Sequence, residues 1–288
     1  MKKLLALFVF SSLFIFSCCS YRPNQKDGIT ILEQKQENKQ ILELNSIVQI
    51  IAMVRSVLIS TETDKIISYS EKVSHSTGVI YKKTEFGPLI LTAAHVCDIF
   101  NENQKKDLHH DYVKGKGILE NDTRFIIKSN DKMVTAIKIH SDQFTEVCIL
   151  LSQDLSLPIS KISHTAPQVG EDLFLVGFAN GLWSKKYFPI FEGKYAGVLP
   201  DEEQYGFIMT IPSYPGASGG PIFNKNNEIV SLLYGFFYET HNLSLGTDLM
   251  SIISATKIAD EKLLISGSTH MEKLKTLHPK DILKSWYD

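Results

Sequence analysis

Short runs of β-forming residues, separated by turn residues, fill this chain from Ile47 to Phe237. The clearest runs are Val79–Tyr81, Leu89–Leu91, Phe125–Ile127, Val134–Ile139, Val147–Leu151, Leu173–Phe178, Lys194–Leu199, Phe207–Ile211 and Ile229–Phe237. Short strands at this spacing favour an antiparallel sandwich or barrel over a fold in which strands alternate with helices. A loop with prolines at both ends, Pro158–Pro167, divides the runs into two groups of similar size. The pattern therefore indicates two packed barrels.

The segments that flank the β-rich region have a different character. Residues 18–46 are polar and rich in lysine, glutamine and glutamate, which is typical of a tether. We assign residues 47–258 to the folded domain and residues 259–288 to a C-terminal tail. Helical periodicity in Ser254–Leu264 and Met271–Trp286 predicts short helices at this end of the chain.

The first residues have the features of an export signal. Two lysines precede an apolar run from Leu4 to Phe16, which is short for a membrane-spanning helix. The tetrapeptide Ile15–Cys18 resembles a bacterial lipobox, in which the signal is removed and the cysteine becomes the lipidated first residue. The resemblance predicts a signal peptide at residues 1–17 and a lipid anchor at Cys18, on a membrane-anchored lipoprotein that faces the periplasm or the cell exterior. A plain secretory signal or an uncleaved anchor would also export the chain.

The stretch Pro215–Pro221 holds three glycines and a single serine, Ser218. Glycine permits positive φ and close backbone approach, and proline fixes φ, so such a turn can bring a hydroxyl and several N–H groups into one geometry. A nucleophilic serine needs this arrangement, because N–H donors must receive the oxyanion that develops during attack. An ordinary hairpin turn has the same composition, so the stretch alone favours an enzyme only modestly.

A histidine in the first half of the chain changes that balance. His95 lies in the stretch Leu91–Cys97, directly after a β-type run and behind small residues. Together with Ser218–Pro221, this stretch resembles the histidine and serine motifs of trypsin-like (chymotrypsin-like) serine endopeptidases, bacterial members above all. The similarity extends from about residue 47 to residue 258, with further matches at Ser76–Val79, Gly170–Phe178 and Ile229–Leu233.

The resemblance implies an all-β fold of two antiparallel six-stranded β-barrels, with the active site in the cleft between them. It makes Ser218 the nucleophile and His95 the general base. The backbone N–H groups of Gly216 and Ser218 would form the oxyanion hole. The implied activity is hydrolysis of peptide bonds in exported or envelope proteins through an acyl-enzyme intermediate, without a cofactor or a metal ion.

The acidic member of the site departs from the family pattern. The family has an aspartate that opens a strand of the form Asp-x-Ala-x-Leu, and the matching stretch here is Glu146–Leu150. Glutamate carries the same charge on a longer side chain, so Glu146 can still hold His95 through its Nδ1. Asp142 is an alternative, and in a third reading neither carboxylate reaches the histidine. The protein would then be catalytically impaired and act as a binding or scaffolding module.

Two cysteines remain outside the targeting segment, in a compartment that permits disulfides. Alternate residues of a strand share a face, so Cys148 points the same way as Glu146, and Cys97 lies two residues beyond His95. If Glu146 contacts His95, the two cysteines come together, which predicts a disulfide between them. Two separate buried thiols are the alternative.

Other features indicate what the protein binds. The resemblance places Ser213, Ser231 and Leu233 along the substrate channel, and the absence of an acidic residue there favours a small or apolar side chain before the cleaved bond. The net charge of −2 gives no electrostatic reason to expect nucleic acid as a partner.

The stretch His109–Asp111 resembles a metal-ligand cluster, but its polar loop holds no further ligand at the required spacing, which favours a solvated loop. An esterase-like fold is disfavoured because no Gly-x-Ser-x-Gly elbow stands between a strand and a helix.

Overall fold

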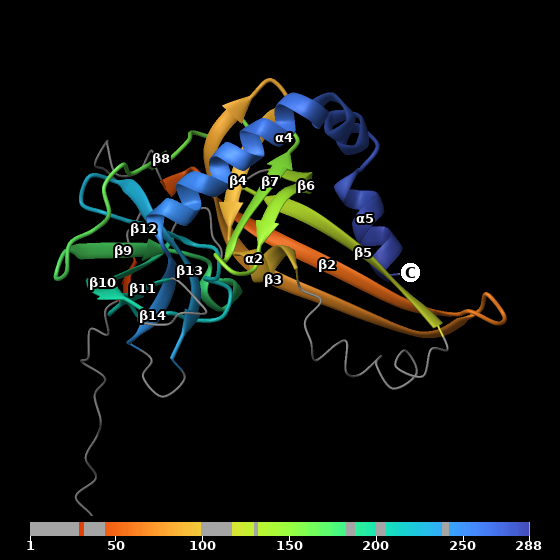
Figure 1. Ribbon diagram of the computed structural model, residues 1–288, viewed down its shortest axis with the longest axis horizontal. Coiled ribbons are helices and arrows are strands. Elements are labelled where there is room, and N and C mark those ends of the chain that lie inside the picture. The colour runs from red at the N-terminus through yellow and green to blue at the C-terminus, as the bar shows by residue number, and fades with distance from the viewer. Residues whose placement is uncertain are drawn as a thin grey trace, which may run out of the picture.

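The computed structural model describes residues 29–31, 44–98, 117–129, 132–182, 188–199, 206–237 and 242–287. The predicted signal peptide, Cys18 and the stretch His109–Asp111 lie outside these ranges. The described part is built mostly of antiparallel strands, with helices at the C-terminal end (Figure 1).

The first barrel comprises six strands that close in the order β2-β3-β4-β7-β6-β5. The strands are β2 (Ile47–Ser60), β3 (Ile66–Thr84), β4 (Gly87–Thr92), β5 (Gly117–Lys128), β6 (Met133–Asp142) and β7 (Val147–Ser152). Strands β2, β3 and β5, of 14, 19 and 12 residues, are the longest of this barrel and extend away from the second barrel, to the right in Figure 1.

The second barrel also has six strands, which run in the order β10-β11-β14-β13-β12-β9 and close where β9 pairs with β10. These strands are β9 (Asp172–Val176), β10 (Pro189–Val198), β11 (Gly206–Met209), β12 (Pro221–Phe223), β13 (Glu228–Phe236) and β14 (Ser244–Thr247). Two short strands are added: β1 (Ile29–Ile31) pairs with β10, and β8 (Lys161–Ile162) pairs with β13. The predicted fold of two six-stranded antiparallel barrels is confirmed. Strand β1 lies within the segment that we assigned to a tether.

Strand β7 shows how the core positions the site. All of its residues are buried, because each of its faces packs against a different part of the protein. Cys148 and Leu150 face the interior of the first barrel, whereas Ile149 and Leu151 join a cluster with residues of the second barrel and of helix α4 (Leu249–Lys275). The shared cluster includes Val176, Phe223 and Leu232 from the second barrel and Ile252, Ala259 and Leu263 from α4. One apolar core therefore fixes the two barrels relative to each other.

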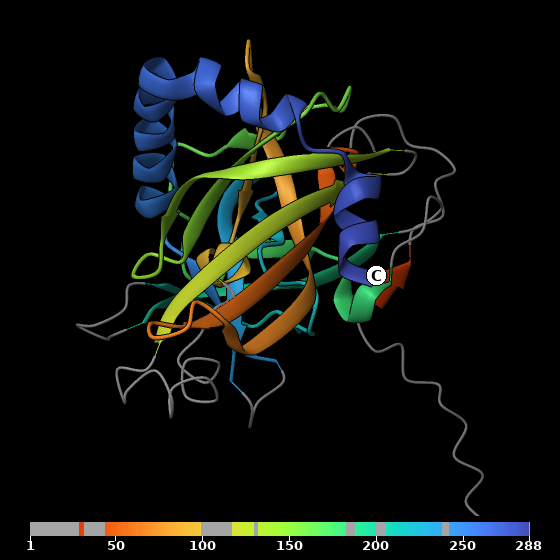
Figure 2. The same cartoon turned by 90° about the vertical axis from the view of Figure 1, so that its right-hand side faces the viewer.

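The C-terminal region has two helices, as expected, but their bounds differ from the predicted ones. A single helix, α4, spans 27 residues and begins before the predicted start, because the Asp248 side chain caps it by accepting the N–H of Ser251. It continues through Gly267, where the absence of a side chain lets the Phe86 ring approach closely. Figure 2 shows that α4 changes direction along its length and that α5 (Pro279–Tyr287) lies against the first barrel.

The remaining helical segments are short or lie against the first barrel. Helix α2 (Ala94–Cys97) and the 3-10 turn Ala179–Gly181 lie in loops at the ends of strands. Ile282 of α5 packs on Met53 and Ile126 of the first barrel. None of the helices in the described ranges combines the length and the apolar character that crossing a membrane requires.

Candidate active site

The candidate base, His95, lies on the one-turn helix α2, directly after β4. The residues in front of it, Ala93 and Ala94, are completely buried, so only small side chains fit at this strand end. His95 itself keeps 42% of its side chain exposed. The sequence thus packs the base of the turn into the first barrel and leaves the imidazole accessible to a substrate.

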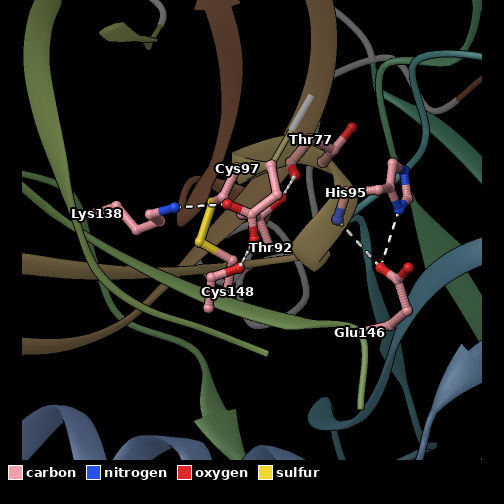
Figure 3. Close-up of a disulfide and its surroundings, with 9 residues drawn as sticks. Thr77, Thr92, His95, Cys97, Lys138, Glu146 and Cys148 are labelled. Atoms are coloured by element: carbon pink, nitrogen blue, oxygen red, sulfur yellow. Dashed lines mark hydrogen bonds and ion pairs between the residues drawn. A yellow bond between two sulfur atoms is a disulfide. The ribbon is translucent and has the colours of Figure 1, made fainter. Parts of the chain in front are cut away.

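The carboxylate of Glu146 holds this histidine at two points (Figure 3). One oxygen, Oε2, accepts the backbone N–H of His95 at 3.2 Å and lies 3.0 Å from the ring Nδ1. A carboxylate can only accept, so Nδ1 carries a proton toward Glu146, and in the neutral ring Nε2 is then the free acceptor. The Glu146 side chain is only 15% exposed, which limits competition from water. Its interaction fixes both the position and the tautomer of the imidazole.

Glu146 reaches this position through an unusual backbone. Its φ is 56°, in the left-handed region, which costs a non-glycine residue about 1–2 kcal/mol. Asp142, the other candidate carboxylate, instead caps the same turn, where it accepts from the N–H of Phe144 at 2.9 Å and the hydroxyl of Thr145 at 3.0 Å. The structure therefore brings Glu146, and not Asp142, to His95.

Two further ties hold the histidine turn to the rest of the first barrel. Cys97 and Cys148 form a disulfide, with their Cα atoms 6.4 Å apart, so the predicted bond is confirmed. The next residue, Asp98, accepts from Lys138 Nζ at 2.5 Å and from the Ser141 hydroxyl at 2.5 Å, both on β6. Figure 3 shows the disulfide and the Glu146–His95 pair on either side of the helix. The turn is thus tied to β6, to β7 and to the loop that carries Glu146.

The Ser218 loop is held by both barrels. On the second-barrel side, Gly219 N–H donates to Leu233 C=O at 2.7 Å. On the first-barrel side, the N–H of Thr77 donates to Ser218 C=O at 2.9 Å, and its hydroxyl donates to Gly216 C=O at 2.8 Å. The same hydroxyl accepts the N–H of Phe178 at 3.0 Å. Thr77 is therefore the contact through which β3 shapes this loop.

The sequence places Thr77 in the stretch Ser76–Val79, which matches the family pattern, but it indicates no individual role for this residue. Its side chain is completely buried and bonds across the junction between the barrels. Asp98 was missed altogether. The sequence signal for Thr77 is a polar residue beside a glycine in a β-type run, but its partners lie more than a hundred positions away in the chain.

Two glycines in the loop are required by geometry. Gly216 has φ +92°, and an added Cβ there would lie 2.5 Å from Phe178 C=O. Gly219 has φ +77°, and its Cβ would lie 2.0 Å from Thr92 Oγ1. Within the described ranges, neither the N–H of Gly216 nor that of Ser218 makes a hydrogen bond. Both of these donors are therefore free to bind an oxyanion.

Ser218 and His95 line one cavity of about 220 Å³, together with Lys72, Ser74, His75, Ser76, Val96 and Asp98. No hydrogen bond joins the Ser218 hydroxyl to His95 among the residues that the structure describes. The cavity lies on the side of the site formed by β3 and α2, which belong to the first barrel.

The residues predicted along the substrate channel are not in this cavity. Ser213, Ser231 and Leu233 are all buried in the second barrel. The hydroxyl of Ser231 donates to Thr247 C=O at 2.7 Å, whereas that of Ser213 finds no partner in the described part of the chain. Their role in the channel stays a prediction. The described ranges also hold no group of His, Cys, Asp and Glu side chains arranged to bind a metal ion.

Residues 76–232, more than half of the chain, match a protein family described as a trypsin-like peptidase domain. A curated relative, the "Probable periplasmic serine endoprotease DegP-like" of Pseudomonas putida (strain GB-1), is 30% identical over 110 residues. That stretch is 37% of this chain and 23% of the relative, so the match spans less than a quarter of the relative's length.

Solved structures are similar in fold. The Rv3671c protease from M. tuberculosis, in its active form, matches with a TM-score of 0.52 and 15% identity, over 80% of this chain and 94% of that one. The serine endoprotease from Yersinia pestis matches with a TM-score of 0.52 and 14% identity, over 80% of this chain and 68% of that one. The arrangement of the barrels is thus one that known proteases share.

Proposed function

This chain belongs to the trypsin-like peptidase domain family, whose members are hydrolases, and we propose that it is a serine endopeptidase that cuts exported or cell-envelope proteins. The observation that carries the proposal is the double contact of Glu146 with His95, at a cavity that Ser218 also lines. Such a site needs a nucleophile, a base and a group that orients the base, and we assign these roles to Ser218, His95 and Glu146.

In the proposed reaction, Ser218 Oγ attacks the carbonyl carbon of the scissile peptide bond while His95 Nε2 takes its proton. The resulting oxyanion is bound by the N–H groups of Gly216 and Ser218, and Glu146 stabilises the imidazolium. His95 then gives the proton to the leaving amine, which breaks the C–N bond and leaves an acyl-enzyme. A water that loses its proton to His95 releases the acid and restores Ser218.

The location of the protein is part of the same proposal. The signal at residues 1–17 would be removed and Cys18 lipidated, so that residues 18–46 would connect the membrane anchor to the catalytic domain at residues 47–258, ahead of the tail at residues 259–288. A relative whose name says periplasmic supports export. The disulfide agrees with a compartment that permits such bonds. The substrates would be proteins or peptides in that compartment.

A fluorophosphonate probe tests the activity directly, because it forms a covalent bond only with an activated serine. We expect the unaltered protein to be labelled and the Ser218→Ala variant to be unlabelled. Casein digestion by the same two proteins would show whether labelling corresponds to peptide-bond cleavage. Equal labelling of both proteins would show that Ser218 is not the nucleophile.

The second candidate is a protease-fold binding or scaffolding module without turnover. The observation that favours it is the missing hydrogen bond between Ser218 and His95 among the described residues. This candidate predicts no labelling and no casein digestion by a folded protein, with circular dichroism as the control for folding.

A further inference from the structure

Among the described residues, one edge of strand β3 has no partner strand over much of its length. The strand pairs with β2 from Ile66 to Val79, but with β4 only from Val79 onward. No strand in the described ranges pairs with the other edge of β3 between Ile66 and Ser76. Figure 1 shows β3 extending with β2 beyond the body of the barrel. An open strand edge offers a row of N–H and C=O groups to which another extended chain can bind.

The direction of these groups follows from one hydrogen bond. The N–H of Thr77 points away from β2, because it donates to Ser218 C=O. The register between β3 and β2 is regular from Ser68 to Val79. Backbone groups in a regular strand alternate between its two edges, so the N–H and C=O of His75, Val73 and Tyr69 also point to the open edge.

This edge leads into the cavity beside the candidate nucleophile. Ser74, His75 and Ser76 line that cavity together with His95 and Ser218. In the proposed reaction the leaving amine takes its proton from His95, so the part of the substrate after the cleaved bond lies on this side of Ser218. A substrate that continues in an extended conformation would therefore reach the edge of β3.

The side chains along the edge are suited to an apolar partner. Tyr69 is 70% exposed and Val73 is 45% exposed, and as alternate residues of the regular part of the strand they lie on one face. Glu71 lies between them on that face, and its carboxylate is paired with Arg55 of β2. Exposed apolar side chains beside an open edge can pack against the side chains of a strand that adds to that edge. From Thr77, Val73 is about 13 Å along the strand and Tyr69 about 26 Å, at ~3.3 Å per residue.

We propose that the open edge of β3 from Tyr69 to His75, the docking edge, binds the substrate segment that follows the cleaved bond. The segment adds a strand to β3, with backbone hydrogen bonds for affinity and apolar side chains packed on Tyr69 and Val73. This inference rests on the proposed function and deepens it. It identifies the substrate class as polypeptides with an extended, apolar, β-forming segment downstream of the cleaved bond, as in unfolded proteins.

Peptide binding to the Ser218→Ala variant tests the docking edge without any need for turnover. The probe is a fluorescein-labelled peptide of alternating valine and threonine, flanked by lysines, and the readout is fluorescence anisotropy. Val73→Pro removes one N–H from the open edge and leaves the pairing with β2 intact, because that N–H points away from β2. Tyr69→Ser removes an exposed side chain that the fold does not need. Leu264→Ser, on α4 and 85% exposed, is the matched control.

We expect Val73→Pro to weaken binding by at least about tenfold, Tyr69→Ser by several-fold, and Leu264→Ser by less than about twofold. The same peptide with N-methyl groups on alternate residues should bind as weakly as the peptide binds Val73→Pro. Equal binding by all variants would overturn the proposal, and so would equal binding of the methylated peptide. A dimer that sedimentation detects and Val73→Pro abolishes, without peptide binding, would assign the edge to a second copy of this chain.

The two proposals fail separately. Loss of the docking edge leaves fluorophosphonate labelling of Ser218 as an independent test of the proposed activity. Conversely, a protein that is not labelled can still bind the peptide at β3, which would leave the docking edge in place as the surface of a binding module.

Discussion

Removing the Cys97–Cys148 disulfide should lower stability by an amount that follows from the length of the loop that the bond closes. The bond closes a loop between residues 51 positions apart in the sequence. In the chain-entropy description, a loop of this length contributes about 4 kcal/mol at 25 °C, because the crosslink restricts the unfolded chain. The double variant Cys97→Ala/Cys148→Ala replaces two buried sulfurs with the small apolar side chain that leaves no unpaired polar group.

Urea unfolding followed by circular dichroism measures this change. With a slope of about 2–3 kcal/mol per molar urea, the loss corresponds to a midpoint lower by about 1.3–2 M. Reducing agent should lower the midpoint of the unaltered protein by a similar amount and leave the double variant unchanged. If the midpoints of the two proteins agree within about 0.3 M and reductant has no effect, the disulfide does not stabilise the fold as argued.

Three other outcomes follow from the site and its surroundings. Glu146→Gln should reduce peptidase activity by about 10²–10⁴-fold, because the amide no longer specifies the tautomer of His95, whereas Asp142→Asn should leave the activity nearly unchanged. Near-full activity of the Gln variant would remove Glu146 from the site. Thr77→Val should lower kcat more than it raises KM, and it should destabilise the fold by about 1–3 kcal/mol because the buried Phe178 N–H loses its acceptor. An unaltered kcat would show that the serine loop keeps its shape without Thr77. Burial and the nearby Lys262 lower the pKa of His140 below 6.5, so the unfolded state binds the extra proton and stability is lost as the pH falls through about 6.5. In the His140→Gln variant the urea midpoint should therefore change less between pH 7.5 and 5.5 than in the unaltered protein, and an equal change would exclude this histidine as the cause.

Much of the fold was predictable because its signals are local in the sequence. Valine, isoleucine and leucine runs mark most strands, and a proline-bounded loop separates the two barrels. The cysteine pairing was also predictable, since each cysteine lies two residues from a residue that the motif brings together. Glutamate in place of aspartate could be predicted to reach His95 only through the family pattern.

The remaining features depend on contacts that no local pattern records. The left-handed backbone of Glu146 arises from the turn that Asp142 caps, and nothing in the residue type demands it. Gly267 in helix α4 lies where a distant ring, Phe86, packs against the helix, and the sequence does not show this contact. The length of β3 beyond the barrel depends on its pairing with β2, and alternating exposed residues such as Tyr69 carry too weak a pattern to predict it.

The bonds from Thr77 to the serine loop have a consequence for the order of events during synthesis. The His95–Glu146 pair and the disulfide are made entirely of residues that precede the second barrel in the sequence. The proposed oxyanion donors at Gly216 and Ser218 are held in place only when the second barrel has folded against Thr77. On the proposed mechanism, a chain that lacks the second barrel would therefore have no oxyanion donors, and the proposed activity would begin only after the second half of the protein has folded.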